Sequence, residues 1–347
     1  MNTKKLRRLA CSAFLVLSLI FVGIPIYAGA AEVINVKMGH VYKKGNIWAE
    51  HNQIFGDVVE KVTNGRVKFK HYWGGTLYST YDEGEKLVIS GEMPFHHTNT
   101  SIQSKYDPRW NAVFAPGVIW GWEHYKAVEK TAAYQSMLKY LEEKVGLKIL
   151  YWIPIPIGDC PFTKKRAIVT LDDWKGLKIR TSPAEAAVLS VKALGGSPII
   201  LGTPETATAI TQGVVDGGIA TFAVVVHAWS APRTVPYVTI MHGGVSLGFM
   251  NVGIQVNLKF WNSLSSDLRE AIESGIPEAQ AKSITWTEQE GQKLFDQYKN
   301  TPGTKITYLT KEQTKVWVDV LEQKALPEMR KKYGSELFEV AKATRPK

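Results

Sequence analysis

Residues 171–221 read LDDWKGLKIRTSPAEAAVLSVKALGGSPIILGTPETATAITQGVVDGGIAT. A short apolar-leaning run ends at Arg180, and the Ser-Pro-Ala-Glu segment at 182–185 has the pattern of a capping box with proline at the first helical position. Small and apolar residues then recur at helical spacing as far as Leu194, where a Gly-Gly pair can end the helix in a left-handed turn. The order strand, helix, strand, helix, strand predicts an α/β fold, with a helix that begins at Pro183.

Arg180 stands at the first junction between strand and helix. The N-terminus of a helix offers unpaired N–H groups and the positive end of the helix dipole, so a guanidinium beside it makes a site for an anion. The rigid fork of arginine donors suits a planar carboxylate. A surface ion pair with Asp172 or Asp173 is the alternative role for this side chain.

The motifs of this stretch resemble a known family. DWKGLKIR at 173–180, ALGGSP at 193–198, ETATAITQGVVDG at 205–217 and VNLKFWNSL at 256–264 occur in this order in the chain. Together they resemble the solute-binding proteins of tripartite ATP-independent periplasmic (TRAP) transporters, the dicarboxylate-receptor (DctP) family. In that family the arginine of the KGLKIR motif binds the ligand carboxylate, and Arg180 occupies its position here.

The resemblance implies a two-lobed α/β fold, with a mixed sheet flanked by helices in each lobe and a ligand cleft between the lobes. Lobe I is expected to comprise residues 32–157 with 246–284, and lobe II residues 158–245 with 285–347. The implied function is that of a periplasmic receptor that binds a small organic anion and delivers it to the membrane components of a TRAP transporter. The protein is expected to be a monomer and not an enzyme, and to need no cofactor.

Three positions depart from the family pattern. Where a second ligand arginine normally stands, this chain has Cys160; where an asparagine and an aromatic residue are common, it has Ala220 and Thr203. A compact dicarboxylate held by two arginines is therefore not the obvious ligand. Other side chains are expected to compensate or to line the site: His40, Trp73, His97, Asn99 and Phe222. A neutral or aromatic solute held by tryptophans remains an alternative.

Ligands of open α/β sheets lie beyond the carboxyl ends of the strands, which makes the Trp73 loop and the segment 97–99 candidate walls of the site. A partly packed aromatic residue is the alternative for Trp73. The neighbouring His96 and His97 do not predict a metal site, because adjacent residues of an extended segment point to opposite faces.

The N-terminal segment has the features of a secretory signal. Lys4, Lys5, Arg7 and Arg8 precede an apolar run at 9–26, and a small-x-small pattern follows at 28–30. Removal of residues 1–31 would place the protein in the periplasm. One cysteine would then remain, which excludes an intramolecular disulfide. The signal carries four positive and no negative residues, so its removal lowers the net charge from +10 to +6, an excess that suits anionic ligands but also simple solubility. No basic run with interleaved aromatic residues follows the signal, so nucleic acid is not an expected partner.

Residues 244–248 read GVSLG and match G-x-S-x-G, the pattern of a hydrolase nucleophile elbow around Ser246. The elbow should lead into a helix, whereas residues 249–256 alternate like a strand. All eight histidines also precede Ser246, although the usual order places the catalytic histidine after the serine. A secreted serine hydrolase is therefore the disfavoured alternative.

Overall fold

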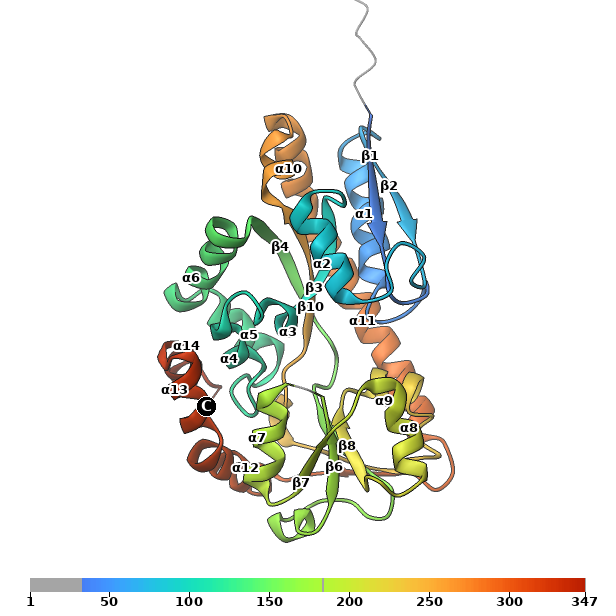
Figure 1. Ribbon diagram of the computed structural model, residues 1–347, viewed down its shortest axis with the longest axis vertical. Helices are drawn as coiled ribbons and strands as arrows, with labels where there is room; N and C mark the ends of the chain where they lie inside the picture. Colours follow the sequence, from blue (N-terminus) through green and yellow to red (C-terminus); the bar gives the residue numbers. More distant parts are fainter. Residues whose placement is uncertain (1–32, 183, 347) are drawn as a thin grey trace, which may run out of the picture. The chain divides into compact units, whose positions relative to one another are not determined.

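The computed structural model describes residues 33–182 and 184–346, and the predicted signal peptide lies outside them. Three β-sheets organise the described chain (Figure 1). The first contains the parallel strands β1 (Ile34–Gly39) and β2 (Val67–Tyr72), which are joined by helix α1 (Glu50–Val62). The second has the order β3-β10-β4 and is antiparallel, with β3 (Phe95–Asn99), β10 (Asn251–Asn257) and β4 (Leu147–Pro154).

The third sheet holds six strands in the order β11-β9-β5-β8-β6-β7. Strands β6, β7 and β8 run parallel to one another, and β5 is antiparallel to both of its neighbours. The bounds are β5 (Cys160–Thr163), β6 (Lys178–Thr181), β7 (Ser197–Ile200), β8 (Gly217–Ala220), β9 (Tyr237–Ile240) and β11 (Lys305–Tyr308). The stretch 171–221 thus forms three neighbouring strands of one sheet, as its sequence predicts.

Helices cover these sheets and connect them. Those before the third sheet are α2 (Tyr81–Ser90), α3 (Thr100–Gln103), α4 (Asn111–Phe114), α5 (Gly121–Glu129) and α6 (Ala132–Tyr140), with short turns at η1 (Pro108–Trp110) and η2 (Leu141–Val145). Along the chain, the strands of the third sheet alternate with η3 (Leu171–Trp174), α7 (Glu185–Leu194), α8 (Thr203–Thr211), α9 (Phe222–Ala228) and η4 (His242–Gly244). The C-terminal part contains α10 (Leu258–Ser263), α11 (Ser266–Lys299), α12 (Lys311–Lys324), α13 (Leu326–Tyr333) and α14 (Glu336–Ala343).

Besides the connection from β10 to β11 through α10 and α11, the chain passes between the second and the third sheet in two short segments, residues 155–159 and 241–250. These segments are joined by main-chain hydrogen bonds: Ile155 N donates to Met250 O at 3.0 Å, and Asp159 N donates to Gly248 O at 2.9 Å. Ile157, between them, has a φ of +55°, a left-handed conformation that is uncommon for a β-branched residue. Two lobes connected by crossing segments follow from this arrangement. Two of the predicted lobe boundaries, after residues 157 and 245, lie in these segments, whereas the third, after residue 284, lies inside α11.

The first two sheets share one apolar core, and the third sheet covers another. Phe55 of α1, Phe95 of β3 and Ile254 of β10 are fully buried in the core of the first two sheets, and Phe162, Val238 and Tyr298 are fully buried under the third. Burial of one such side chain contributes roughly 1.5–3 kcal/mol. Helix α11 contacts both α1 and α9, so one helix packs against both lobes (Figure 1).

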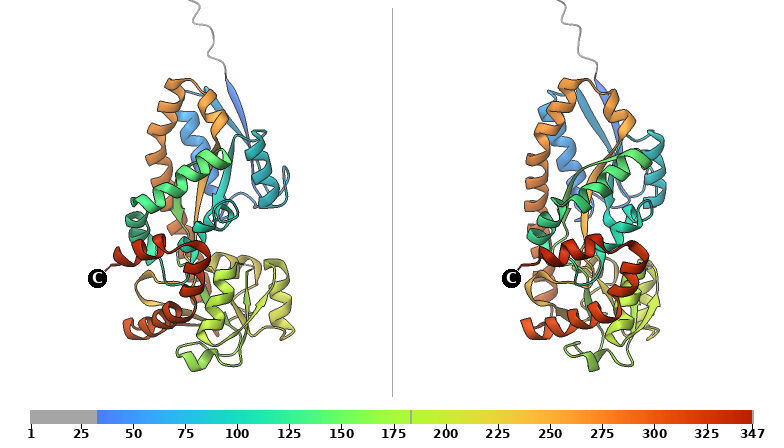
Figure 2. Two further views of the ribbon diagram at one scale, coloured as in Figure 1. Left: turned by 60° about the vertical axis from the view of Figure 1, so that its left-hand side comes forward. Right: turned by 90° about the vertical axis from the view of Figure 1, so that its left-hand side faces the viewer.

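The C-terminal helices also connect the two lobes. Helix α12 packs on α7, whereas α13 and α14 pack against α4, α5 and α6 (Figure 2). Trp317 of α12 stacks edge-to-face on Trp174, and Phe338 of α14 belongs to the same core as Trp110, Trp152 and Tyr125. The aromatic residues at 110, 125 and 134 are therefore core residues.

One local prediction was wrong. Helix α7 begins at Glu185 with Ala184 as its N-cap, and no capping box forms. The Glu185 carboxylate instead accepts hydrogen bonds from Lys332 Nζ and Tyr333 Oη of α13. A contact distant in sequence has taken the side chain that the local pattern assigned to the cap. A capping box does form at the start of α12, between Thr310 and Gln313.

Candidate ligand-binding site

Three successive strand-to-helix units bring their helix N-termini to one place. The parallel strands β6, β7 and β8 end side by side, and α7, α8 and α9 begin just beyond them. The N-cap residues Ala184, Gly202 and Thr221 make no side-chain cap hydrogen bond within the described chain. Since the first N–H groups of a helix lack intrahelical acceptors, this edge of the sheet carries a positive potential without any charged side chain.

A cavity of about 700 Å³ opens against this edge. Its lining combines apolar and aromatic side chains with polar groups from both lobes. It comprises Tyr42, Trp48, Tyr81, Asn99, Thr100, Ser101, Ile102, Ser104, Lys105, Asn111, Phe114, Asp159, Arg180, Ser182, Ala184, Glu185, Thr203, Ile219, Ala220, Thr221, Val224 and Met250. A cavity of this size that is mostly apolar, with a few convergent polar groups, is typical of a site for a small organic molecule.

Arg180, in β6, is the central charged group of the wall formed by lobe II. It is 4% exposed, and its Nε donates to Leu201 O at 3.0 Å while one terminal nitrogen donates to Ile219 O at 3.4 Å. The other terminal nitrogen lies 3.3 Å from Thr203 Oγ1, and the guanidinium lies 5.2 Å from the ring centroid of Trp229. Arg180 therefore forms no surface ion pair with Asp172 or Asp173, which excludes that alternative: Asp172 pairs with Lys175 and Asp173 with Arg166.

Asp159 brings a carboxyl group to the same cavity. No hydrogen bond or ion pair to this carboxyl is formed by residues 33–182 or 184–346, and Arg180 lies beyond ion-pair distance. Burial raises the pKa of Asp159 to about 7, and the charge of Arg180 opposes this shift. The cavity thus holds one guanidinium and one carboxyl that are not paired with each other.

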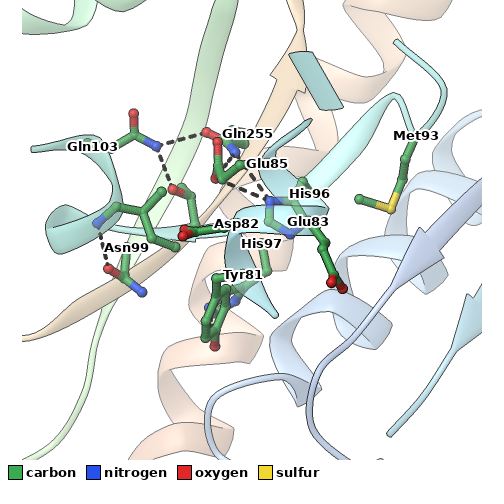
Figure 3. A network of polar contacts seen from close by, with 12 residues as sticks. Tyr81, Asp82, Glu83, Glu85, Met93, His96, His97, Asn99, Gln103 and Gln255 are labelled. Atoms are coloured by element: carbon green, nitrogen blue, oxygen red, sulfur yellow. Dashed lines mark hydrogen bonds and ion pairs between the residues drawn. The ribbon is translucent and has the colours of Figure 1, made fainter. Parts of the chain in front are cut away.

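The wall formed by lobe I is aromatic and is supported by a buried histidine network. Tyr81 lines the cavity, and its hydroxyl is joined to His97 Nε2 at 3.2 Å; His97 Nδ1 is joined to His51 Nε2 at 2.9 Å. Next to His97 in the strand, His96 points the other way, to Glu85 and Gln255 (Figure 3). The histidine pair is thus split between two networks, as the alternation of a strand predicts.

Two hydroxyl groups of the lining have no partner in the described chain. Thr100 Oγ1 and Thr221 Oγ1 are buried and unbonded, and both residues line the cavity, one from each lobe. Buried polar groups are nearly always hydrogen-bonded, so unbonded hydroxyls at a cavity indicate groups available to a ligand. Asn99, next to Thr100, uses its Oδ1 to cap helix α3.

Of the residues predicted for the site, Arg180, Asn99, Thr203 and Ala220 line the cavity. The other five are not among the residues that line it, which does not support direct ligand contacts for them. Cys160 is buried in β5 opposite Ala220, and Phe222 packs against Phe162 and Tyr298. His40 stacks on Trp73 at a centroid distance of 3.9 Å and on His71 at 5.1 Å, and His97 lies behind Tyr81.

Sequence reasoning missed Asp159, Tyr81 and Trp48. A sequence signal for Asp159 exists, because it directly precedes Cys160, the position at which the family arginine is missing. The β-strand begins at that cysteine, which turns its side chain into the core and leaves Asp159 on the cavity side. For the two aromatic residues no local pattern separates a cavity wall from a core.

Ser246 has no catalytic surroundings. It is 4% exposed, and its Oγ has no hydrogen-bond partner among the described residues. The segment continues into strand β10 rather than into a helix. Over the same residues no group of three histidine, cysteine or acidic side chains is arranged to hold a metal ion, and no helix is both long and apolar enough to cross a membrane.

The chain is similar in sequence to known solute-binding proteins. The family model "Bacterial extracellular solute-binding protein, family 7" (DctP) matches residues 38–332. The chain is 24% identical over 322 residues to the C4-dicarboxylate-binding periplasmic protein of Rhodobacter capsulatus, covering 90% of this chain and 91% of the relative.

Solved structures share the fold. A TRAP periplasmic solute-binding protein from Ochrobactrum anthropi matches with a TM-score of 0.81 at 22% identity, covering 90% and 95% of the two chains. The sugar acid binding protein of Advenella mimigardefordensis, in complex with galactonate, matches with a TM-score of 0.76 at 19% identity, covering 90% and 99%. The chain belongs to the DctP family of extracellular solute-binding proteins, the non-enzymatic periplasmic receptors of TRAP transporters.

Proposed function

We propose that this receptor binds a small organic acid in the cavity between its lobes, with the carboxylate on Arg180. It then presents the acid to the membrane components of a TRAP transporter. The two lobes, divided at the crossing segments, close around the ligand during this cycle. Closure removes water from the cavity and strengthens the electrostatic contact with the guanidinium.

The observation that carries the proposal is the position of Arg180. Its Nε and one terminal nitrogen are held by backbone carbonyl groups, which fixes the plane of the guanidinium in the cavity wall. The uncapped N-termini of α8 and α9 lie at the same wall. An anion at this wall would contact both the fixed guanidinium donors and the unpaired N–H groups of the helices. A neutral solute would not use the positive potential of either feature.

The relatives support an acid as the ligand class. One binds C4-dicarboxylates according to its name, and another was crystallised with galactonate, a sugar acid. A neutral or aromatic solute is the second candidate, because Tyr42, Trp48, Tyr81 and Phe114 form an aromatic wall opposite Arg180.

The experiment begins with a thermal-shift screen of mono- and dicarboxylates, sugar acids, sulfonates and aromatic acids. A ligand at a hundred times its Kd adds about 2.7 kcal/mol to the stability of the folded state. Calorimetric titration of the best acid then compares wild type with Arg180→Lys and Arg180→Ala. Lysine keeps the charge and loses the fork, so we expect it to weaken binding clearly.

Alanine leaves the bound anion unpaired, at a cost of roughly 2–5 kcal/mol, or about 30- to several-thousand-fold in Kd. Arg166→Ala is the matched control, since Arg166 is half exposed and pairs with Asp173 outside the cavity. Binding by Arg180→Ala within threefold of wild type would reject the carboxylate anchor in favour of the neutral solute.

A further inference from the structure

The main chain of Asp159 is fixed where its side chain lines the cavity. Asp159 N donates to Gly248 O, and Asp159 O accepts from Leu247 N, each at 2.9 Å, so both main-chain groups are fixed against the second crossing segment. A Cβ added at Gly248 would lie 3.0 Å from Asp159 Oδ2. Glycine at this position therefore leaves room for the carboxyl, and the side chain has a defined position at the cavity.

This carboxyl has no partner in the described protein, unlike the other charged groups of the lining. Lys105 pairs with Asp82, and Glu185 accepts from Lys332 and Tyr333. Arg180 and Asp159 are left as the two charged groups of the lining without an ion-pair partner in residues 33–182 and 184–346. The raised pKa of Asp159 agrees with this geometry, since burial without a hydrogen-bond donor disfavours the carboxylate.

A ligand that satisfies both groups needs two different functions. Its carboxylate would pair with Arg180, and a hydrogen-bond donor on the same molecule would bind the carboxyl of Asp159. A dicarboxylate would place a second negative charge near Asp159, and like charges in a water-poor cavity repel. The carboxyl of Asp159 therefore favours acids that carry a hydrogen-bond donor and disfavours dicarboxylates.

We propose that Asp159 is the specificity-determining residue of this receptor, selecting acids that carry a hydroxyl or ammonium donor and rejecting dicarboxylates. The inference rests on the proposed function, because it requires a carboxylate on Arg180. It assigns a ligand class to the cavity: hydroxy acids such as sugar acids, or zwitterionic amino acids.

The test uses four-carbon probes that differ in one feature. Erythronate carries hydroxyl donors, 4-aminobutyrate carries an ammonium, butyrate carries no donor beyond the carboxylate, and succinate carries a second carboxylate. Their dissociation constants are measured by calorimetry at about pH 8 for wild type, Asp159→Asn, Asp159→Ala and Asp159→Glu. Asp172→Asn is the matched control, because Asp172 is exposed and pairs with Lys175. Melting temperatures without ligand establish that each variant is folded.

Wild type is expected to bind erythronate or 4-aminobutyrate at least tenfold more tightly than butyrate, and succinate weakly. Asp159→Ala should reduce that preference to within threefold, and Asp159→Asn should bind succinate at least tenfold more tightly than wild type does. The two donors are distinguished by Asp159→Asn, whose amide oxygen can still accept from a hydroxyl but cannot neutralise an ammonium.

Two failures separate the inference from the proposed function. If Arg180→Ala abolishes binding of an acid while every Asp159 variant keeps the wild-type order of the four probes, the carboxylate anchor stands and the role of Asp159 is refuted. If no acid binds, or if Arg180→Ala binds as wild type does, both fail together. Should Asp159→Asn and Asp159→Ala both be unfolded, Asp159→Glu decides: unchanged preferences despite its longer side chain would contradict the inference.

Discussion

The buried histidines of lobe I should make the stability of this protein fall as the pH is lowered. His40 is 2% exposed and His51 is fully buried. Burial, together with neighbouring histidines, lowers the pKa of His40 to about 2, and burial lowers that of His51 to about 3. Burial and the histidines around it also hold the pKa of His97 well below its ordinary value.

The sign follows from proton linkage. A folded-state pKa below the unfolded value of about 6.5 contributes stability that is present above that pH and is lost as the pH falls. When the pH falls from about 7.5 to about 5.5, each histidine that stays neutral in the folded state lowers the free energy of unfolding by about 1.4 kcal/mol. Three such histidines give a loss of about 4 kcal/mol.

Asp159 acts in the opposite direction. Its folded pKa is raised to about 7, so the stability that it contributes is present at low pH and is lost as the pH rises through 7. Over the same interval it offsets at most about 2 kcal/mol of the histidine effect. The free energy of unfolding of wild type should therefore fall by about 2 kcal/mol when the pH is lowered from 7.5 to 5.5, and that of Asp159→Asn should fall by about 4 kcal/mol.

Urea unfolding at the two pH values, with and without Asp159→Asn, measures both differences. His51→Gln should reduce the loss by about 1.4 kcal/mol, whereas His227→Gln is a control at an exposed histidine. A free energy of unfolding that is equal at both pH values in Asp159→Asn would refute the account of the histidine network.

Two further changes test local features. Ser246→Ala removes a buried hydroxyl without a partner, so we expect equal or up to about 1 kcal/mol higher stability and unchanged ligand affinity; covalent labelling of Ser246 by a fluorophosphonate would contradict its structural role. Thr310→Ala removes the cap of α12 and should cost about 1 kcal/mol in urea unfolding, whereas Ser335→Ala, at an N-cap without a side-chain bond, should cost clearly less. Equal losses for the two variants would count against the cap.

The sequence was sufficient for the three strands and two helices of residues 171–221, and it singled out Arg180, whose role as the ligand anchor stays a prediction. Periodicity and turn residues reveal β6, α7 and β7 because these features are local, and Arg180 was found because its position at a strand end is also local. Contacts distant in sequence could not be read in this way. Glu185 was assigned to a cap and is held by α13, which lies more than a hundred residues further along the chain.

The walls of the cavity show the same limit. Tyr81 lines the cavity and His97 lies behind it, and nothing in their neighbouring sequence distinguishes the wall from the supporting layer. Cys160 and Asp159 differ by one position, and only the pairing of β5 with β8 decides which of the two turns into the core. Four of the nine predicted ligand residues therefore line the cavity, and their contact with a ligand stays a prediction.

The hydrogen bonds of Arg180 have a consequence for how this receptor can be studied. The arginine belongs to β6, its carbonyl partner Ile219 belongs to β8, and its partner Leu201 directly follows β7. The orientation of the guanidinium thus depends on the alignment of three strands. A substitution in the core under this sheet that shifts one strand by a fraction of an ångström would tilt the fork long before the fold is lost. Ligand affinity should report the integrity of the lobe more sensitively than melting temperature does.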